Sequence, residues 1–292
     1  MSSSTSSHPP PPSSPSYILS YPSPSILLIT INRPQQMNSL PSAAHWEADA
    51  ILTWFDDSPI LRVAVITGAG EKAFCAGQDL IEQEEIRRRR ETKGENEGNG
   101  NGEGRMLLMH PPSGFMGVSR RVGKKPVIAA VNGWALGGGF EICLGCDIIL
   151  ASPKATFGLP EASRGLYAAA GGLSRLVRLA GMTLASEIAL TGRNLSAAEA
   201  LHHGIINRIS QTPASLVPEA IAVAEKMSEL SPDAIIVTRH GLRESWELAS
   251  VERASQSTDN RYGRALKEGE NLKIGLRAFR EKKKPKWVAS KL

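Results

Sequence analysis

Short runs of apolar residues and longer stretches with helical spacing follow one another along this chain, and their order predicts an α/β fold. Continuous β-branched runs bounded by proline or glycine are typical of buried strands. Between the first two such runs, residues 43–55 carry Trp46, Ala50 and Trp54 on one face, which indicates a helix. The predicted strands are at 25–32, 62–68, 126–133, 146–152 and, in a shorter form, 155–161.

From about Gly171 onward the pattern becomes helical. The sequence SAAE at 196–199 has the spacing of a capping box, in which a serine and a glutamate bond each other's backbone N–H groups at a helix start. Residues 218–230 and 232–246 each carry a proline in the first turn of a predicted helix. The first part of the chain is therefore expected to be α/β and the last part mainly helical.

Two stretches do not fit this pattern. Residues 1–24 are rich in serine and proline and lack the apolar core of a signal peptide, so they are expected to form a disordered tail. Residues 84–105 are charged and rich in glycine and asparagine, which predicts a mobile loop. This leaves a core at 25–215, a helical C-terminal region at 216–285 and a final tail at 286–292.

Composition narrows the class of protein. The chain is 41% apolar and 22% charged, as in ordinary globular proteins, and no apolar run approaches the ~20 residues that span a bilayer. Part of its formal charge of +5 sits in two clusters, Arg87–Arg90 and Lys282–Lys286. Neither has aromatic residues interleaved with it, so both are expected to be solvated faces. Neither a membrane nor a nucleic acid is therefore expected as a partner.

The cysteines and histidines do not suggest a metal or redox site. Three cysteines cannot build a disulfide framework, and Cys143 and Cys146 lie in an apolar stretch where a CxxC is expected to pack in a buried helix. No second cysteine pair is present to complete a zinc site, and His202-His203 has no ligand partner at useful spacing. No bound metal is expected.

The final residues Ser290, Lys291 and Leu292 match the peroxisomal address that an import receptor reads at a carboxyl terminus. The preceding KKKPKWVA has the composition of an exposed tail that such a receptor could grip. The sequence therefore predicts a peroxisomal location, with the import receptor as a partner.

The segment ITGAGEKAFCAGQDL, at 66–80, first suggests a dinucleotide fingerprint, because Gly68, Gly70 and Ala73 fit G-x-G-x-x-A after a predicted strand. That fingerprint also requires a helix of several turns directly afterwards. Gly77 interrupts the segment within a few residues, so nicotinamide binding is rejected.

Two segments, FCAGQDL and NGWALGGGFE, each lead from a predicted strand through small residues to an apparent helix start. Small residues there let a ligand touch the backbone and leave N–H groups free. Two such segments side by side would supply converging donors, which is an oxyanion hole. Taken singly, each set of glycines would more simply serve a tight turn or close helix packing.

Two glutamates strengthen the catalytic interpretation. Glu141 lies three residues after Gly138 in the first turn of a predicted helix, and Glu161 follows Pro160 at a strand exit. Both have apolar neighbours, where an unpaired acid is costly. Two such acids beside two anion-stabilising turns indicate acid–base chemistry next to a developing enolate.

These segments resemble the crotonase, or enoyl-CoA hydratase/isomerase, superfamily. The resemblance runs from about residue 25 to 285, and the matching stretches are LLITINRP, KAFCAGQDL, KPVIAAVNGWALGGGFEICLGCDI, ATFGLPEASRGL and AGGLSRLVRLAG. It implies a spiral of ββα turns with a C-terminal helical oligomerisation region, assembled as a homo-trimer or hexamer.

The resemblance also implies roles for individual residues. The backbone N–H groups of Ala76 and Gly138 would bind the thioester carbonyl oxygen of an acyl-CoA substrate. Glu141 and Glu161 would hold one water, one acting as base while the water adds to Cβ and the other supplying a proton to Cα. No cofactor is implied, because coenzyme A is part of the substrate. The neighbouring residues implied in substrate binding are Gly77, Gln78, Asp79, Leu80 and Gly137.

The sequence leaves the acyl group and the reaction open. Gln35 and Gln36 stand where the family often has a basic residue for coenzyme A, and LYAAAGG lacks the usual Pro-Gly near the acyl pocket. Details such as GKKPVIAAVNG resemble a fungal peroxisomal subgroup that includes mevalonyl-CoA hydratases of siderophore synthesis and hydratases of toxin pathways.

Two alternatives to a hydratase follow from the same residues. An enoyl-CoA isomerase would rely on one main carboxylate, matching Glu161, although the presence of both acids argues for hydration. An RNA-binding homologue would use the basic surface, and salt-dependent RNA binding that survives loss of both glutamates would favour it.

Overall fold

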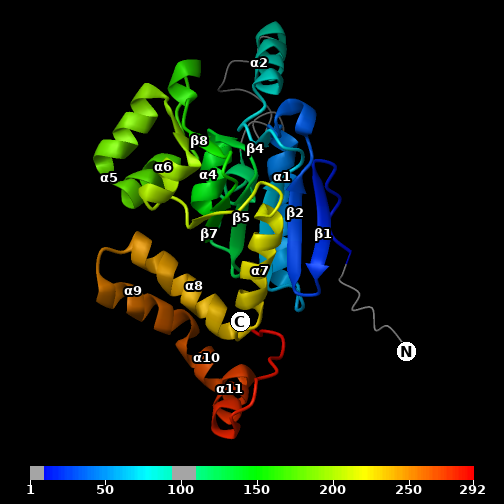
Figure 1. The fold of residues 1–292 in the computed structure, drawn as a ribbon, viewed down its shortest axis with the longest axis vertical. Coiled ribbons are helices and arrows are strands. Elements are labelled where there is room, and N and C mark those ends of the chain that lie inside the picture. Colours follow the sequence, from blue (N-terminus) through cyan, green and yellow to red (C-terminus); the bar gives the residue numbers. More distant parts are fainter. Residues whose placement is uncertain (1–9, 94–109) are drawn as a thin grey trace.

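A computed structural model describes residues 10–93 and 110–292, and its centre is a six-stranded sheet (Figure 1). The strands are β1 (Tyr17–Ser23), β2 (Ile26–Ile31), β3 (Val63–Gly68), β5 (Val127–Val131), β7 (Ile148–Ala151) and β10 (Arg208–Ile209). They lie in the order β1-β2-β3-β5-β7-β10. β1 pairs antiparallel with β2, and the other neighbours are parallel.

A second sheet has four short strands in the order β4-β6-β8-β9. These are β4 (Ala73–Cys75), β6 (Trp134–Leu136), β8 (Thr156–Gly158) and β9 (Asn194–Ser196). Along the chain they alternate with strands of the large sheet, and a helix follows each pair: α2 (Leu80–Lys93), α4 (Gly138–Gly145) and α5 (Gly172–Thr191). The succession β3–β4–α2, β5–β6–α4 and β7–β8–α5 confirms the expected spiral of ββα turns.

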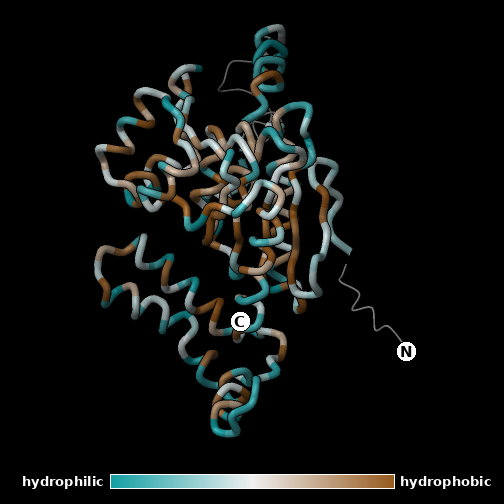
Figure 2. The backbone as a smooth tube through the Cα atoms, in the orientation of Figure 1, coloured by the Kyte–Doolittle hydropathy of each residue, from teal (hydrophilic) through white to brown (hydrophobic). Residues whose placement is uncertain are grey.

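The central strands β2, β3 and β5 are largely buried on both faces, as their continuous apolar runs predict. Successive residues of a strand point to opposite faces. Ile66 belongs to the cluster that contains the buried residues of α1 (Ser42–Asp57), whereas Val65 packs in a second cluster with α7 (Leu216–Ser228). Figure 2 shows hydrophobic residues gathered in the strands between these helices.

The last part of the chain is helical, as expected. The helices after α5, besides α7, are α6 (Ala197–His202), α8 (Pro232–Glu247), α9 (Val251–Thr258), α10 (Arg264–Glu268) and α11 (Glu270–Glu281). α8 to α11 form an arm that extends away from the two sheets in Figure 1. The capping box is present at α6, where Ser196 and Glu199 each accept a hydrogen bond from the other's backbone N–H.

The prediction of a disordered tail over 1–24 is wrong for its last part, because residues 17–23 form β1. Tyr17 is buried, and its hydroxyl donates to the Ala44 carbonyl oxygen of α1 at 2.9 Å. Pairing with β2 orders a segment whose surrounding serines and prolines indicate disorder. The first nine residues of this tail lie outside the described residues.

The prediction of a mobile loop over 84–105 is also wrong in part. Residues 84–93 belong to α2, and 94–105 lie outside the described residues. The charged residues that suggested a loop form ion pairs at helical spacing: Arg87 Nε lies 2.9 Å and Arg88 Nε 2.8 Å from carboxylate oxygens of Glu84. Such pairs stabilise a solvated helix that buries little apolar surface.

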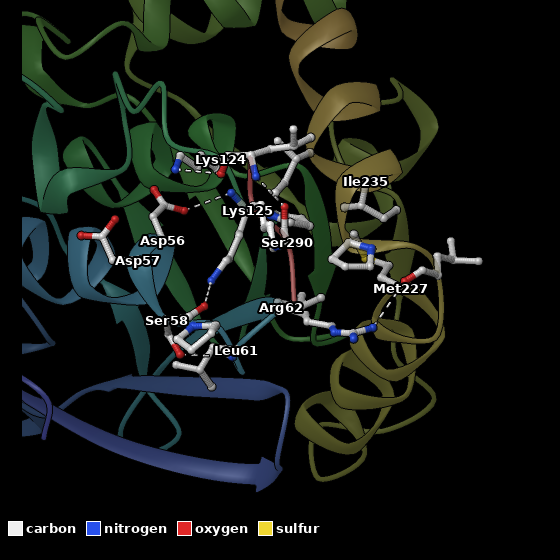
Figure 3. Close-up of a pocket in the computed structure, with 18 residues that line it drawn as sticks. Asp56, Asp57, Ser58, Leu61, Arg62, Lys124, Lys125, Met227, Ile235 and Ser290 are labelled. Carbon is white, nitrogen blue, oxygen red and sulfur yellow. Dashed lines mark hydrogen bonds between the residues drawn. The ribbon is translucent and has the colours of Figure 1, made fainter. Parts of the chain in front are cut away.

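The final tail at 286–292 makes two hydrogen bonds to the rest of the molecule. Trp287 Nε1 donates to the Glu229 carbonyl oxygen at 2.8 Å, and Lys124 Nζ donates to the backbone oxygen of Leu292 at 3.0 Å. The tail lines a cavity of about 220 Å³, shown in Figure 3 with Lys124 at its edge. Most residues of 282–289 are exposed, as expected, while Trp287 and Leu292 contact the rest of the molecule in this conformation.

Candidate active site

Three glycines follow β6, and each is required for a different reason. Gly137 has φ 54° and ψ −124°, a conformation that disfavours other residues. A Cβ on Gly138 would lie 2.5 Å from the ring of Phe115, and one on Gly139 would collide with the Cys75 carbonyl oxygen of β4. The glycines therefore let β6 turn directly into α4 while the second sheet packs against it.

This turn leaves a backbone donor at the start of α4. The N–H groups of Phe140 and Glu141 donate to the Gly137 carbonyl oxygen at 2.9 and 3.0 Å. The N–H of Gly138 has no acceptor among residues 10–93 and 110–292. It is thus one of the free donors that the first turn of a helix presents.

The facing turn after β4 corrects one expectation. The Ala76 N–H donates to the Met37 carbonyl oxygen at 3.1 Å, so it is already paired and cannot serve as the second oxyanion donor in this conformation. Met37 comes from a segment that is 39 positions earlier in the chain. No local pattern around Ala76 indicates this contact.

A backbone N–H without an acceptor in the described chain follows two residues later, at Gln78. Leu40 bonds the two residues that flank Gln78: its N–H donates to the Gly77 oxygen and its oxygen accepts from the Asp79 N–H, both at 2.9 Å. In such a parallel bridge the middle residue turns its own N–H away from the partner. The Gln78 N–H has no acceptor within the described part of the chain.

The two turns lie against each other. Gly77 has φ +93°, and a Cβ there would lie 2.9 Å from the Leu136 carbonyl oxygen and 3.4 Å from the Gly138 nitrogen. The backbones of the two segments are therefore in close approach. Gln78 and Gly138 are the pair whose unpaired N–H groups flank the same cavity.

The remaining residues expected in this segment divide into two groups. Asp79 does not line the cavity; its carboxylate pairs with Arg33 Nη2 at 2.8 Å, which fixes the turn to the segment after β2. Leu80, at the start of α2, lines the cavity and is 41% exposed. The cavity has a volume of about 320 Å³ and is also lined by Gly77, Gln78, Gly137, Gly138, Glu141 and Glu161.

The Glu141 carboxyl group is buried and accepts a backbone hydrogen bond. It is only 3% exposed, and its Oε1 accepts a 2.8 Å hydrogen bond from the Gly172 N–H at the start of α5. Burial raises the pKa of Glu141, while the Gly172 and Ala170 N–H groups and the positive charges of Arg175 and Arg120 oppose the rise.

Glu161 has a different environment. It begins a short 3₁₀ segment, η3 (Glu161–Arg164), and its Oε2 is buried without a hydrogen-bond partner among the described residues. Burial, with a smaller contribution from the negative charge of Glu141, raises the pKa of Glu161 to about 7. A free, desolvated carboxyl oxygen favours the protonated form. The cavity therefore combines a carboxyl group that accepts a backbone hydrogen bond with one whose buried oxygen has no partner in the described chain and whose pKa is raised to about 7.

The sequence did not indicate the contribution of three aromatic residues near Gln78. His45 of α1, His110 and Phe115 pack edge-to-face or tilted against one another, with ring centroids 4.3 to 5.2 Å apart. His110 and Phe115 line the cavity. The signal that the sequence offered for His45 was a histidine inside the predicted helix at 43–55. The structure shows that this side chain is fully buried.

The other expectations on side chains concern metals and cysteines. Cys143 and Cys146 are buried, which agrees with a packing role. In the ranges 10–93 and 110–292, no group of three His, Cys, Asp or Glu side chains could hold a metal ion. No helix in those ranges is long and apolar enough to cross a membrane.

The fold and this site define a class of protein. Residues 22–290 match the enoyl-CoA hydratase/isomerase family, and the chain belongs to it. A crystal structure of an enoyl-CoA hydratase from Bacillus anthracis superposes with a TM-score of 0.81 at 32% identity, covering 94% of this chain and 100% of that one.

The relatives narrow the class to hydratases. The chain is 45% identical to mevalonyl-coenzyme A hydratase sidH of Aspergillus fumigatus, over 99% of this chain and 100% of that protein. It is 34% identical to the short-chain-enoyl-CoA hydratase of Clostridium acetobutylicum, over 89% of this chain and 92% of that protein. The chain is therefore an enoyl-CoA hydratase-type lyase that acts on acyl-CoA thioesters, and the isomerase and RNA-binding alternatives gain no support.

Proposed function

We propose that Glu141 and Glu161 catalyse the reversible addition of water to a 2-enoyl-CoA while Gln78 and Gly138 hold the thioester oxygen. The observation that carries this assignment is the contrast between the two carboxyl groups of one cavity. Glu141 accepts a backbone hydrogen bond, whereas the buried Oε2 of Glu161 has no partner in the described chain. Unlike environments separate the pKa values of paired acids and so divide the roles of base and acid.

In the hydration direction, ionised Glu141 removes a proton from water as the water oxygen bonds to Cβ. The electron pair of the Cα–Cβ double bond moves toward the thioester, and negative charge develops on its carbonyl oxygen. The N–H groups of Gln78 and Gly138 stabilise that charge. Glu161 then gives its proton to Cα, which completes the 3-hydroxyacyl-CoA. Dehydration follows the same steps in reverse, and no cofactor takes part.

The substrate that we propose is a short, branched acyl-CoA of the mevalonyl type. The relatives from Aspergillus fumigatus and Beauveria bassiana, at 45% and 43% identity, are both mevalonyl-coenzyme A hydratases. A cavity of about 320 Å³ suits a short acyl group. The corresponding reaction would interconvert mevalonyl-CoA and its dehydrated enoyl form. This reaction would place the enzyme in siderophore synthesis.

The location and assembly are further parts of the proposal. We propose import into peroxisomes through Ser290, Lys291 and Leu292. We also propose a trimer or hexamer built through the helical arm. Leu276 and Phe279 of α11 are 63% and 87% exposed in the single chain, and an assembly would cover such side chains.

A direct assay tests the proposed reaction. The purified protein is mixed with mevalonyl-CoA, crotonyl-CoA and longer enoyl-CoA thioesters, and the conjugated enoyl absorbance is followed in both directions. We expect the highest kcat/KM with the dehydrated mevalonyl thioester. Turnover of straight-chain substrates alone would contradict the substrate assignment, and turnover of none would contradict the catalytic one.

A further inference from the structure

Gln78 contributes more than its backbone, because two imidazoles hold its side chain. Its Oε1 lies 2.9 Å from His45 Nε2 and 3.3 Å from His110 Nε2. His45 is fully buried in α1, whereas His110 lines the cavity beside Gln78. The side chain thus connects the interior of the protein with the wall of the active site.

A backbone donor determines the orientation of the Gln78 amide. The Met116 N–H donates to His45 Nδ1 at 3.1 Å, so this ring nitrogen carries no proton. Burial lowers the pKa of His45 to about 3, and the ring is therefore neutral with its single proton on Nε2. Nε2 must then donate, and the atom of Gln78 that it meets must be the oxygen.

The fixed orientation leaves the Gln78 NH₂ group with two donors to satisfy. Neither donor has an acceptor among residues 10–93 and 110–292. The oxygen is directed toward buried His45, so the NH₂ group is left for an acceptor within the cavity that Gln78 lines. An acyl chain made only of carbon and hydrogen would leave these donors without a partner or dependent on water, which costs binding free energy.

We propose that Gln78 is a specificity-determining residue whose side-chain NH₂ donates a hydrogen bond to an oxygen substituent on the acyl chain. His45 acts as a positioning residue that keeps the NH₂ group turned toward the substrate. The thioester oxygen is already served by the backbone N–H groups of Gln78 and Gly138, so the side chain is free for a second oxygen. This inference rests on the proposed function of the cavity as an acyl-CoA site, and it adds that hydroxylated acyl chains are selected over hydrocarbon chains of the same shape.

A matched pair of substrates tests the selection. We compare 5-hydroxy-3-methylpent-2-enoyl-CoA with 3-methylpent-2-enoyl-CoA, which lacks only the hydroxyl group. The wild-type enzyme should favour the hydroxylated thioester by about ten- to hundredfold in kcat/KM, the range of one or two well-placed hydrogen bonds. In Gln78→Met, which keeps the length of the side chain but has no donor, this ratio should fall to near one. The ratio of the two kcat/KM values is the quantity to compare. A substitution that distorts the turn would lower kcat/KM for both substrates, whereas loss of the donor alone changes their ratio.

The control is Gln83→Met, the same amide-to-thioether change at another residue lining the cavity. Its ratio should equal that of the wild type. His45→Leu should lower the ratio, and His45→Gln, which places an amide donor near the Nε2 position, should restore part of it. An unchanged ratio in Gln78→Met, or a wild-type ratio of one, would overturn the inference.

Binding separates this inference from the proposed reaction. Calorimetry with the saturated thioesters, 5-hydroxy-3-methylpentanoyl-CoA and 3-methylpentanoyl-CoA, needs no turnover. We expect at least tenfold tighter binding of the hydroxylated thioester by the wild type and nearly equal affinities in Gln78→Met. If this preference holds while no enoyl-CoA is hydrated, the reaction assignment fails and the specificity assignment stands. Equal wild-type affinities would overturn the specificity assignment, whatever the enzyme catalyses.

Discussion

The backbone N–H of Gly172 lies 2.8 Å from Glu141 Oε1 and fixes the orientation of that carboxylate in the cavity. Gly172 opens α5, so the positive end of the helical segment before the kink at Gly181 adds to the effect of the hydrogen bond. Glu161 lacks a comparable partner for its buried Oε2 among the described residues. The difference assigns two functions to residues of one chemical type, and it can be tested by changing either residue.

Replacing Glu141 or Glu161 by glutamine keeps the shape of the side chain but removes proton transfer. Each change should lower kcat by ~10²–10⁴, the usual range for a general acid or base. The double variant should lose far less than the product of the single losses, because the residues act on one water. Stopped-flow or steady-state assays on the enoyl absorbance measure these rates, and the affinity for free coenzyme A should barely change. A fully active Glu141→Gln together with an inactive Glu161→Gln would instead point to an isomerase.

The raised pKa of Glu161 predicts a pH-dependent change in stability. Its pKa is about 7 in the folded protein against an ordinary value of 4.5, so folding strengthens proton binding at this site. This contribution to stability is complete below the unfolded pKa and is lost as the pH rises through about 7. Glutamine does not titrate, so the Tm of Glu161→Gln relative to wild type should rise between pH 5 and pH 8. A constant Tm difference over that range, measured by calorimetry, would show that the folded pKa is not raised.

Alanine at Gly172 tests whether the position of Glu141 matters. A Cβ there would lie 2.7 Å from Glu141 Cγ, so the carboxylate must shift. Misplacement of a catalytic group by about 1 Å can cost ~10²-fold, and we expect kcat to fall roughly 10- to 100-fold without unfolding. Gly241→Ala in α8 is the matched control, because its Cβ would make an ordinary contact 3.6 Å from Thr258. The control should keep wild-type kcat and gain about 0.5–1 kcal/mol of stability.

The sequence predicted the features that depend on local patterns. Continuous apolar runs identified β2, β3, β5 and β7, and their glycine-rich exits located the two turns of the site. The sequence could not predict which backbone N–H of the turn after β4 is free. That depends on a distant segment, in which the Met37 oxygen pairs with the Ala76 N–H and Leu40 bonds the two neighbours of Gln78. β1 was missed for the same reason: Tyr17 is ordered by its contact with Ala44, and its own neighbours give no sign of a strand.

The tail contact leads to a prediction about peroxisomal import. Lys124 Nζ donates to the backbone oxygen of Leu292, so a receptor that grips the last three residues must first displace this contact. The apparent affinity of such a receptor is reduced by the fraction of tails that are released. Lys124→Met removes the contact, which is partly exposed and is worth ~1 kcal/mol, so receptor binding should strengthen about fivefold. Deleting Leu292 should abolish binding and leave tagged protein in the cytosol, with the fold intact. Tighter receptor binding by the wild type than by Lys124→Met would show that the docked tail is the recognised form, and cytosolic protein with an intact tail in cells with working peroxisomes would refute the location.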